Sequence, residues 1–384
     1  MDLVGRRYDT GEAVVVSCEQ GRIARVSCAE DAPTLPWISP GWCDLQVNGY
    51  GGQEFSATTL TVERVGEIVH AIQRMGVTTF LPTVTTNSSD VLLHALCVIA
   101  AAIESRPDIL ASVPGIHLEG PYLSAIDGPR GAHAKQFCRD PDWDEFQRFQ
   151  HAACGHIRLI TLSAEHESSP DFIRRATSSG VLVAIGHTAA TSDQIRAAVD
   201  AGARLSTHLG NGAHLTLPRH PNYLWDQLAE DRLAASLIAD GHHLPPEVVK
   251  TFVRAKGDER IILISDLSGM AGLPPGRYRT ELCELEILPH GKLVVAGQDK
   301  LLAAASAPLS VGIANVMRFA GVDLKTAVEM ASTQPAKLIG RDDGGLIVGA
   351  AANLTLFDLA DDPSRAITVR ETMVGGVSVH RGNS

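Results

Sequence analysis

Four polar residues stand directly behind short apolar runs, and their types suit metal-assisted hydrolysis. Glu119 follows GIHL, His187 follows AIG, His208 follows LST and Asp266 follows LIS. Two imidazoles and one carboxylate can hold a divalent ion such as zinc and leave one coordination position open for water. The remaining carboxylate can then move a proton. We therefore expect a metal site at Glu119, His187 and His208, with Asp266 as the catalytic acid/base.

Each of these residues alone also has an ordinary structural explanation. The chain has 15 histidines, and a single histidine at a strand end is more often a hydrogen-bonded structural residue than a metal ligand. Their combination favours the metal. Glu119 and Asp266 follow almost wholly apolar runs, where an ionised carboxylate is costly unless a cation or hydrogen bonds offset the cost.

The elements that must position these residues are eight apolar runs that alternate with amphipathic helical stretches between Gly41 and about residue 340. Such alternation predicts βα units and a parallel sheet. Eight strands separated by helices is the count of a (β/α)8 TIM barrel, an α/β fold whose active sites lie at the C-terminal ends of the strands. The runs are WCDLQV (42–47), VTTFLPT (77–83), SVPGIHL (112–118), IRLITL (157–162), VLVAIG (181–186), ARLSTH (203–208), LAASLIA (233–239) and RIILIS (260–265).

The two ends of the chain show shorter alternating strands with glycine turns. One example is VVVSCEQGRIARVSC, and another is ITVRETMVGGVSVHRG. Neither end is long enough for a core of its own, so we expect both termini to form one small β-sandwich. The expected domains are 1–40 plus 345–384 for the sandwich and 41–344 for the barrel hydrolase domain. A hairpin is also expected at 277–298, after the eighth strand.

Charge and cysteine content exclude several classes of partner and location. The 384-residue chain has a net charge of -11 and no cluster of Lys and Arg, which disfavours a nucleic-acid partner. The seven cysteines are odd in number, scattered and without a Cys-x-x-Cys pair, as in reduced cytosolic proteins. No secretion signal or membrane span is recognisable. We expect a cytoplasmic protein that acts on a small molecule.

Seven motifs, in this order, resemble those of the N-acetylglucosamine-6-phosphate deacetylases of the amidohydrolase superfamily, over nearly the whole chain. The combination of HLEGP followed by GAH, then GHT and THL, is highly specific. The motifs are PGWCDLQVNGYGG, GIHLEGPYLSAIDGPRGAH, AIGHTAAT, STHLGNGAH, IADGHHL, LISDLSGMAG and MASTQPAKLIG with GLIVGAAANLTLFD.

The resemblance implies roles for individual residues. The metal ligands fall on Glu119, His187 and His208, and the acid/base on Asp266. It also implies a homodimer in which Arg219 reaches the substrate phosphate of the partner subunit. Further substrate-binding positions are Ala132, His133, Asn211, Gly212, His243, Leu302, Ala303 and Ala304. For His133, a hydrogen bond to the developing oxyanion and a supporting role beside Glu119 or a loop remain equally open.

The first strand bears on the number of metal ions. In the position where amidohydrolases usually carry His-x-His, this chain has Gln46 and Asn48. Neutral amides are poor zinc ligands beside imidazole and carboxylate. The sequence therefore predicts one divalent ion per subunit, with zinc as the default and iron, cobalt or manganese as alternatives.

The chain departs from the family around the expected pocket. An aromatic residue and then Asn-Ala-Met usually follow the strand-six histidine, whereas this chain has Leu209 and then GNGA (210–213). The closing segment has Ala304 in place of a glycine, and Asp266 is followed by Leu267 instead of a small residue. These changes leave the metal and the base intact but alter the pocket.

Three functions therefore remain open. The first is deacetylation of N-acetylglucosamine 6-phosphate or a close N-acetyl amino-sugar phosphate. The second is hydrolysis of another small amide, such as an unphosphorylated N-acetyl sugar or an N-acyl amino acid. The third is a catalytically inactive sugar-phosphate binder, which the retention of Asp266 beside the ligand set disfavours, because a binder needs no base.

Overall fold

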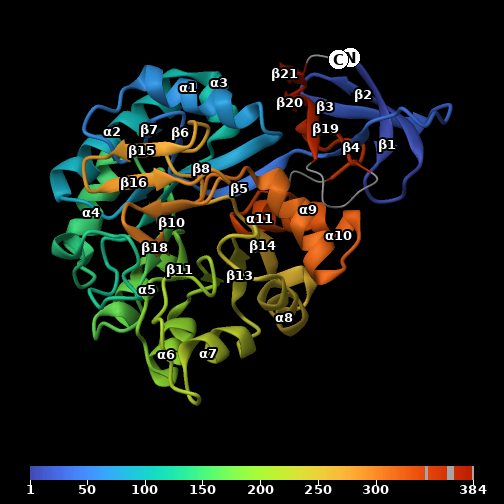
Figure 1. Ribbon diagram of the computed structural model, residues 1–384. Coiled ribbons are helices and arrows are strands. Elements are labelled where there is room, and N and C mark those ends of the chain that lie inside the picture. Colours follow the sequence, from blue (N-terminus) through green and yellow to red (C-terminus); the bar gives the residue numbers. More distant parts are fainter. Residues whose placement is uncertain (342–344, 361–366, 383–384) are drawn as a thin grey trace.

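The computed structural model describes residues 1–341, 345–360 and 367–382, and its centre is a barrel of eight parallel strands (Figure 1). Neighbouring strands follow chain order, with helices between them on the outside. This confirms the predicted (β/α)8 fold. The strands are β5 (Trp42–Val47), β8 (Val77–Thr85), β9 (Ile116–Glu119), β10 (Ile157–Leu162), β11 (Leu182–Ile185), β12 (Leu205–Ser206), β13 (Ala234–Leu237) and β14 (Ile261–Leu263).

The outer layer consists of helices whose apolar faces cover the strands. α2 begins at the N-cap Ser88, whose hydroxyl accepts a bond from Val91 N, and buries its apolar side, including Leu92 and Ile99. The covering helices are α1 (Val62–Gln73), α2 (Ser89–Ser105), α3 (Pro107–Ser112), α4 (Trp143–Ala152), α5 (Ser169–Ser178), α6 (Ser192–Ala201), α7 (Tyr223–Ala229), α8 (Pro246–Lys256), α9 (Leu309–Ala320), α10 (Leu324–Met330) and α11 (Thr333–Leu338).

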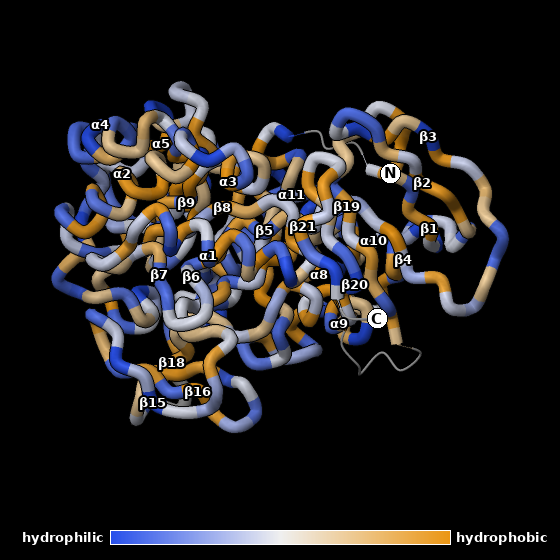
Figure 2. Tube along the Cα trace, turned by 90° about the horizontal axis from the view of Figure 1, so that it is seen from above, coloured by the Kyte–Doolittle hydropathy of each residue, from blue (hydrophilic) through white to orange (hydrophobic). Residues whose placement is uncertain are grey.

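The strands read as continuous apolar runs because a parallel sheet is buried on both faces. All six residues of β5 are buried. A cluster that joins Leu45, Leu81, Leu159 and Ile262 contains residues of strands that are not neighbours, so these side chains meet inside the barrel. Figure 2 shows the orange, hydrophobic segments concentrated in the strands and the blue, hydrophilic segments in the outer loops.

Two predictions from the sequence differ from the structure. The third barrel strand begins later than expected, and the insertion after the eighth strand is larger than a hairpin. The run 112–118 begins as the end of α3, and β9 starts only at Ile116. Pro107 at the start of α3 favours the helix, and Pro114 with Gly115 separates it from the strand. The expected hairpin at 277–298 is instead a four-stranded antiparallel sheet of β15 (Gly276–Arg279), β16 (Glu284–Ile287), β17 (Leu293–Val295) and β18 (Gln298–Leu302).

The two ends of the chain form one small β domain beside the barrel, as predicted (Figure 1). β19 pairs antiparallel with β4 and so joins the two ends. The strands form a continuous seven-stranded sheet, in the order β21 (Val377–Arg381), β20 (Thr368–Val374), β19 (Leu354–Asp358), β4 (Trp37–Pro40), β1 (Asp2–Arg7), β2 (Ala13–Glu19) and β3 (Arg22–Cys28). The domain limits 1–40 plus 345–384 and 41–344 stay a proposal, since residues 342–344, 361–366 and 383–384 lie outside the described residues.

None of the described helices is long and apolar enough to cross a membrane.

The barrel closes where β5 meets the chain that follows β14. Val47 forms a parallel bridge with Leu267, and Asp266 N donates to Gln46 O at 3.0 Å. Beneath this seam lies Asp44, which is 1% exposed. Its Oδ1 accepts bonds from Ser265 N at 3.1 Å and from Gln46 N at 3.2 Å. The Asp44 carboxylate thus joins the first strand of the barrel to the last.

We predict that Asp44→Ala lowers the free energy of unfolding by about 2–5 kcal/mol at pH 7. Two buried N–H groups, of Gln46 and Ser265, lose their acceptor, and each unsatisfied group costs about 1–3 kcal/mol. Urea unfolding followed by circular dichroism measures the difference. A loss below about 1 kcal/mol would show that the seam does not depend on this carboxylate.

The isosteric Asp44→Asn is the matched control and tests pH dependence. Burial raises the pKa of Asp44 to about 6, above the value of about 4 in an unfolded chain. Between these values the native state binds more protons than the unfolded state, so the stability contributed by Asp44 falls as the pH rises from about 4 to 6. We expect the difference in unfolding free energy between wild type and Asp44→Asn to change by on the order of 2 kcal/mol across this range. If the unfolding free energies of wild type and Asp44→Asn changed in parallel with pH, this expectation would be wrong.

Candidate active site

The four residues singled out from the sequence meet at the C-terminal end of the barrel. Glu119 is the last residue of β9, and His187, His208 and Asp266 follow within three residues of β11, β12 and β14. His187, His208 and Asp266 adopt left-handed backbone conformations, with φ of 48°, 32° and 52°. Such conformations are rare outside glycine and are found at functional sites, where the surrounding structure maintains them.

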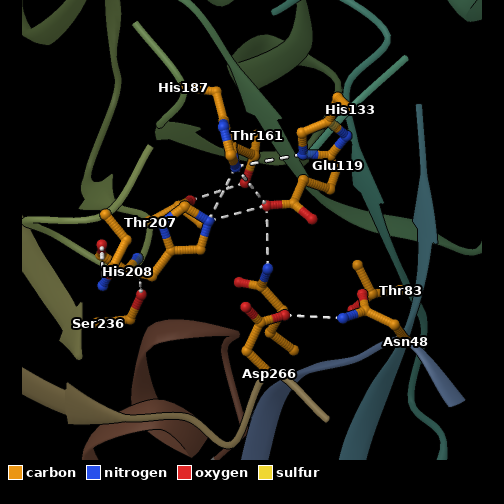
Figure 3. Close-up of polar contacts among 12 residues, drawn as sticks. Asn48, Thr83, Glu119, His133, Thr161, His187, Thr207, His208, Ser236 and Asp266 are labelled. Atoms are coloured by element: carbon orange, nitrogen blue, oxygen red, sulfur yellow. Dashed lines mark hydrogen bonds and ion pairs between the residues drawn. The ribbon is translucent and has the colours of Figure 1, made fainter. Parts of the chain in front are cut away.

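The side chains of Glu119, His187 and His208 point toward one another (Figure 3). Glu119 Oε1 lies 3.0 Å from His208 Nε2 and 3.4 Å from His187 Nε2. The two Nε2 atoms are 3.1 Å apart. His133 joins the cluster, with its Nε2 3.2 Å from His187 Nε2, and one ligand atom from each of Glu119, His133 and His187 lies within 4.8 Å of the others. The structure thus brings all three predicted ligands together and adds His133 beside them.

The orientation of His187 is fixed by the loop that follows β9. Its Nδ1 lies 2.8 Å from Pro129 O, and because a carbonyl only accepts, Nδ1 carries the proton. The lone pair of the neutral ring is then on Nε2, which faces Glu119 and His208. Gly131 and Gly212 pack against the ring: a Cβ at Gly131 would lie 3.0 Å from Cε1, and one at Gly212 would lie 2.7 Å from Nδ1.

Two amides, one in β5 and one directly after it, donate to the two carboxylates of the site. Gln46 Nε2 donates to Glu119 Oε1 at 3.0 Å, and Asn48 Nδ2 donates to Asp266 Oδ1 at 2.7 Å. The pairing of β5 with β8 shifts register between Asp44 and Val47, and such an irregularity re-aims side chains. From the sequence we expected only that these amides are poor zinc ligands. Their hydrogen bonds to the two carboxylates were not predicted.

The two carboxylates have opposite pKa shifts. Burial alone would raise the pKa of Glu119, but the imidazoles of His187 and His208 hold it well below its usual range. Burial, and then the negative charge of Glu119, raise the pKa of Asp266 to about 7. Glu119 therefore remains ionised at neutral pH, whereas Asp266 can both accept and release a proton.

The donor set fits a divalent cation. His187 offers a lone pair on Nε2, and Glu119 offers an ionised, buried carboxylate within reach of that atom. Nitrogen and carboxylate oxygen are the ligands that zinc prefers, and a cation would offset the burial of the Glu119 charge.

Asp266 is also held from the inserted sheet. Ala305 N donates to Asp266 O at 2.8 Å, and Ser268 N donates to Ala305 O at 2.8 Å. The neighbouring Ala304 has φ of 59°, a conformation that costs an alanine more than a glycine. The segment after β18 thus forms both a wall of the site and a support for the backbone of Asp266.

The site opens into a cavity of about 1280 Å³. All predicted substrate-binding residues line it except Arg219, which is exposed on the surface of this chain. His243 is held by Asp240, whose Oδ2 lies 2.8 Å from His243 Nδ1. Among the described residues that line the cavity, Arg130 is the only Lys or Arg. The predicted substrate-binding residues in the lining are Ala132, His133, Asn211, Gly212, His243, Leu302, Ala303 and Ala304.

Sequence reasoning missed three kinds of support for the site. It did not find the Pro129 carbonyl, because a backbone acceptor leaves no signature in residue type. It did not pair Asp240 with His243, although their spacing of three residues in ADGHH was a usable signal. It also missed the inserted sheet as a wall, to which Leu282, Leu285 and Leu301 contribute.

We predict that Gly212→Ala weakens metal binding by about 10–100-fold, a range typical for loss of the groups that orient a ligand. The added methyl would lie 2.7 Å from His187 Nδ1 and so displace the ring from Pro129 O. Metal retained during dialysis against graded chelator concentrations measures the effect.

Gly375→Ala is the matched control, because Gly375 has φ of 55° against 56° at Gly212 but no atom within 4 Å of an added Cβ. The control carries the same backbone strain without contact to His187 and should bind metal as the wild type does. Equal metal affinity in Gly212→Ala and Gly375→Ala would show that packing against Gly212 does not fix the His187 ring.

Comparison with known proteins agrees with this geometry. Residues 37–379 match the model of the Amidohydrolase family. The N-acetylglucosamine-6-phosphate deacetylase of Homo sapiens is 32% identical over 332 residues, which cover 84% of this chain and 79% of the human protein. The N-acetylgalactosamine-6-phosphate deacetylase of Escherichia coli O157:H7 is 32% identical over 323 residues, or 84% and 83% of the two chains.

Solved structures show the same similarity. A mutant N-acetyl-D-glucosamine-6-phosphate deacetylase from Mycobacterium smegmatis, in complex with N-acetyl-D-glucosamine-6-phosphate, superimposes with a TM-score of 0.88 at 28% identity over 99% of both chains. The N-acetylglucosamine-6-phosphate deacetylase of Thermotoga maritima gives 0.86 at 26% identity over 100% of both chains. The chain therefore belongs to the amidohydrolase family, in the group of amino-sugar 6-phosphate deacetylases.

Proposed function

We propose that this hydrolase removes the acetyl group from an N-acetyl amino-sugar 6-phosphate, with N-acetylglucosamine 6-phosphate as the first candidate and glucosamine 6-phosphate and acetate as products. The observation that carries the proposal is the convergence of Glu119, His187 and His208, with Asp266 beside them, in one cavity. Glu119 is held ionised among imidazoles, and Asp266 has a pKa of about 7. Relatives named as deacetylases of such sugar phosphates support the substrate class.

One divalent cation per subunit, most simply zinc, would be held by Glu119, His187 and His208. A bound divalent cation lowers the pKa of water and polarises a carbonyl group, which favours attack on the acetamide at neutral pH. Gln46 and Asn48 donate their amide N–H groups to carboxylates, which argues against a second cation between them.

Asp266 would accept a proton from the attacking water and return it to the leaving nitrogen, because a pKa near 7 permits both steps. Burial, and then the charge of His187, lower the pKa of His133 to about 3, so this ring is neutral at pH 7. A neutral imidazole still carries one N–H. We assign that N–H to the carbonyl oxygen as it becomes an oxyanion, since His133 lines the cavity beside the cluster.

The sugar would lie against the lining residues of the loops that follow β9, β12 and β13 and of the inserted sheet. The human glucosamine and the bacterial galactosamine enzymes are equally similar to this chain, so either epimer fits the proposal. The residues proposed to contact the sugar are Ala132, His133, Asn211, Gly212, His243, Leu302, Ala303 and Ala304.

The phosphate group would be bound across a homodimer. Arg219 is exposed and lies outside the cavity of its own chain, so it is available to a partner subunit. A guanidinium group suits a phosphate through paired hydrogen bonds. The scarcity of basic residues in the described lining keeps a second candidate open, hydrolysis of an unphosphorylated small amide.

The cysteines are odd in number and scattered, which favours a cytoplasmic location.

We predict that Asp266→Asn keeps about one equivalent of metal but lowers kcat by about 10²-fold or more, because the amide preserves the shape and cannot accept the proton of water. Elemental analysis and acetate release measure the two quantities. His187→Ala is the contrasting variant and should lose metal and activity together. Near-normal turnover by Asp266→Asn would place the base elsewhere.

We predict that Arg219→Ala raises KM for N-acetylglucosamine 6-phosphate by about 10-fold or more, which corresponds to about 1–3 kcal/mol of lost charge-assisted bonding. The unphosphorylated sugar should be barely affected, because it lacks the group that Arg219 would bind. Steady-state kinetics with both substrates measures the difference.

Mixing Arg219→Ala with Asp266→Asn chains provides the control for the dimer. Each mixed dimer can combine an intact Asp266 in one subunit with an intact Arg219 from the other, so part of the activity should return. Equal losses on both substrates, or no loss on either, would instead favour the unphosphorylated amide and leave Arg219 as an ordinary surface residue.

A further inference from the structure

Asn48 has a buried acceptor that no described residue uses. The residue directly follows β5 and lines the cavity. Its Nδ2 donates to Asp266 Oδ1 at 2.7 Å, whereas its Oδ1 is shielded from solvent and has no hydrogen-bond partner within the described part of the chain. A buried acceptor without a partner costs about 1–3 kcal/mol, so the position is unfavourable until a donor arrives.

The orientation of this amide follows from its neighbour. Asp266 in its ionised form accepts but does not donate, so in that form the NH2 group of Asn48 faces Asp266 and the carbonyl oxygen occupies the other branch of the side chain. The second amide of the strand, Gln46, uses its NH2 group on Glu119 in the same way. Asn48 differs from Gln46 because its oxygen is left unpaired and Asn48 lines the cavity.

The donor that must come close to this oxygen is the nitrogen of the scissile amide. Asp266 has to reach that nitrogen to deliver a proton, and Asn48 is hydrogen-bonded to Asp266. On the basis of the proposed deacetylase function, we infer that Asn48 Oδ1, which is shielded from solvent in this structure, becomes accessible as the substrate enters and accepts the N–H of the substrate's acetamide. Asn48 is then a substrate-contacting residue with two functions, because one end orients the base and the other orients the leaving group.

This contact strengthens as the reaction proceeds. The oxygen of water bonds to the acetyl carbon, the C–N bond breaks, and its electron pair goes to nitrogen, which takes up the proton from Asp266. Once it has taken up this proton, the nitrogen carries a positive charge, and its N–H groups are better donors than that of the neutral amide. An interaction that is stronger in the transition state than in the bound substrate raises kcat as well as kcat/KM.

The test compares the N-acetyl substrate with the matching 2-O-acetyl ester of the 6-phosphorylated sugar, which lacks the N–H. We expect Asn48→Ala to lower kcat/KM for the amide about 10–100-fold more than for the ester. Asn48→Asp keeps an acceptor oxygen at the same place and replaces only the donor to Asp266. Both rates should fall in Asn48→Asp, but the amide-to-ester ratio should stay at least about fivefold above that of Asn48→Ala, because the acceptor oxygen is retained.

The two variants separate this contact from support of the base. If Asn48 acts only by orienting Asp266, Asn48→Asp and Asn48→Ala lower the amide-to-ester ratio equally, because both remove the donor to Asp266, and the inference is overturned. Equal losses on amide and ester in Asn48→Ala also overturn it. Should Asn48→Ala fail to fold, Asn48→Leu, which is nearly isosteric and also lacks both polar groups, takes its place in the comparison.

Gln298→Ala serves as the matched control, because it removes another amide that lines the cavity but belongs to the inserted sheet. Its amide-to-ester ratio should equal that of the wild type, and a collapse there as deep as in Asn48→Ala would overturn the assignment to Asn48. Wild-type turnover of the N-acetyl sugar phosphate tests the proposed function separately. An active wild type with an unchanged ratio in Asn48→Ala rejects only the contact, whereas an inactive wild type rejects the function.

Discussion

Closure of the barrel between β5 and the chain after β14 is the constraint on which both carboxylates depend. Asp266 takes its backbone position from the bond of its N–H to Gln46 O, and the side chain of Gln46 reaches Glu119. Asp44 holds the same two segments from below. The two carboxylates come from β9 and from beyond β14, and β5 is the strand that contacts both. A change in register at this seam would therefore displace base and ligand together.

The electrostatic arrangement follows from this geometry. Both Glu119 and Asp266 are buried, and burial alone would raise the pKa of each. Their pKa values shift in opposite directions because their neighbours differ. Glu119 lies among imidazoles, whereas Asp266 faces the negative charge of Glu119 and receives one amide donor. Two carboxylates in one cavity can thus serve different roles, one permanently charged and one that exchanges a proton.

The sequence was sufficient for the barrel, because buried parallel strands leave continuous apolar runs and polar residues behind such runs are conspicuous. It was also sufficient for the convergence of Glu119, His187, His208 and Asp266, since strand ends of a barrel share one face. It was not sufficient for the supports of the site. The position of a backbone carbonyl such as that of Pro129 depends on the path of the chain in space and not on residue type. The same holds for the register shift that re-aims Gln46. Arg219 is the opposite case, because the resemblance implies its role and the cavity of its own chain does not include it.

The bonds between Ala305 and the segment Asp266–Ser268 connect Asp266 to the inserted sheet through the residues that follow β18. The four-stranded sheet from β15 to β18 has its own small core of residues such as Leu285 and Leu293. Its residues Leu282, Leu285 and Leu301 line the cavity, and the residues directly after its last strand bond to the backbone of Asp266. A change in this sheet that alters the shape of the cavity would therefore also bear on the position of Asp266, so that substrate range and the proposed proton transfer would change together.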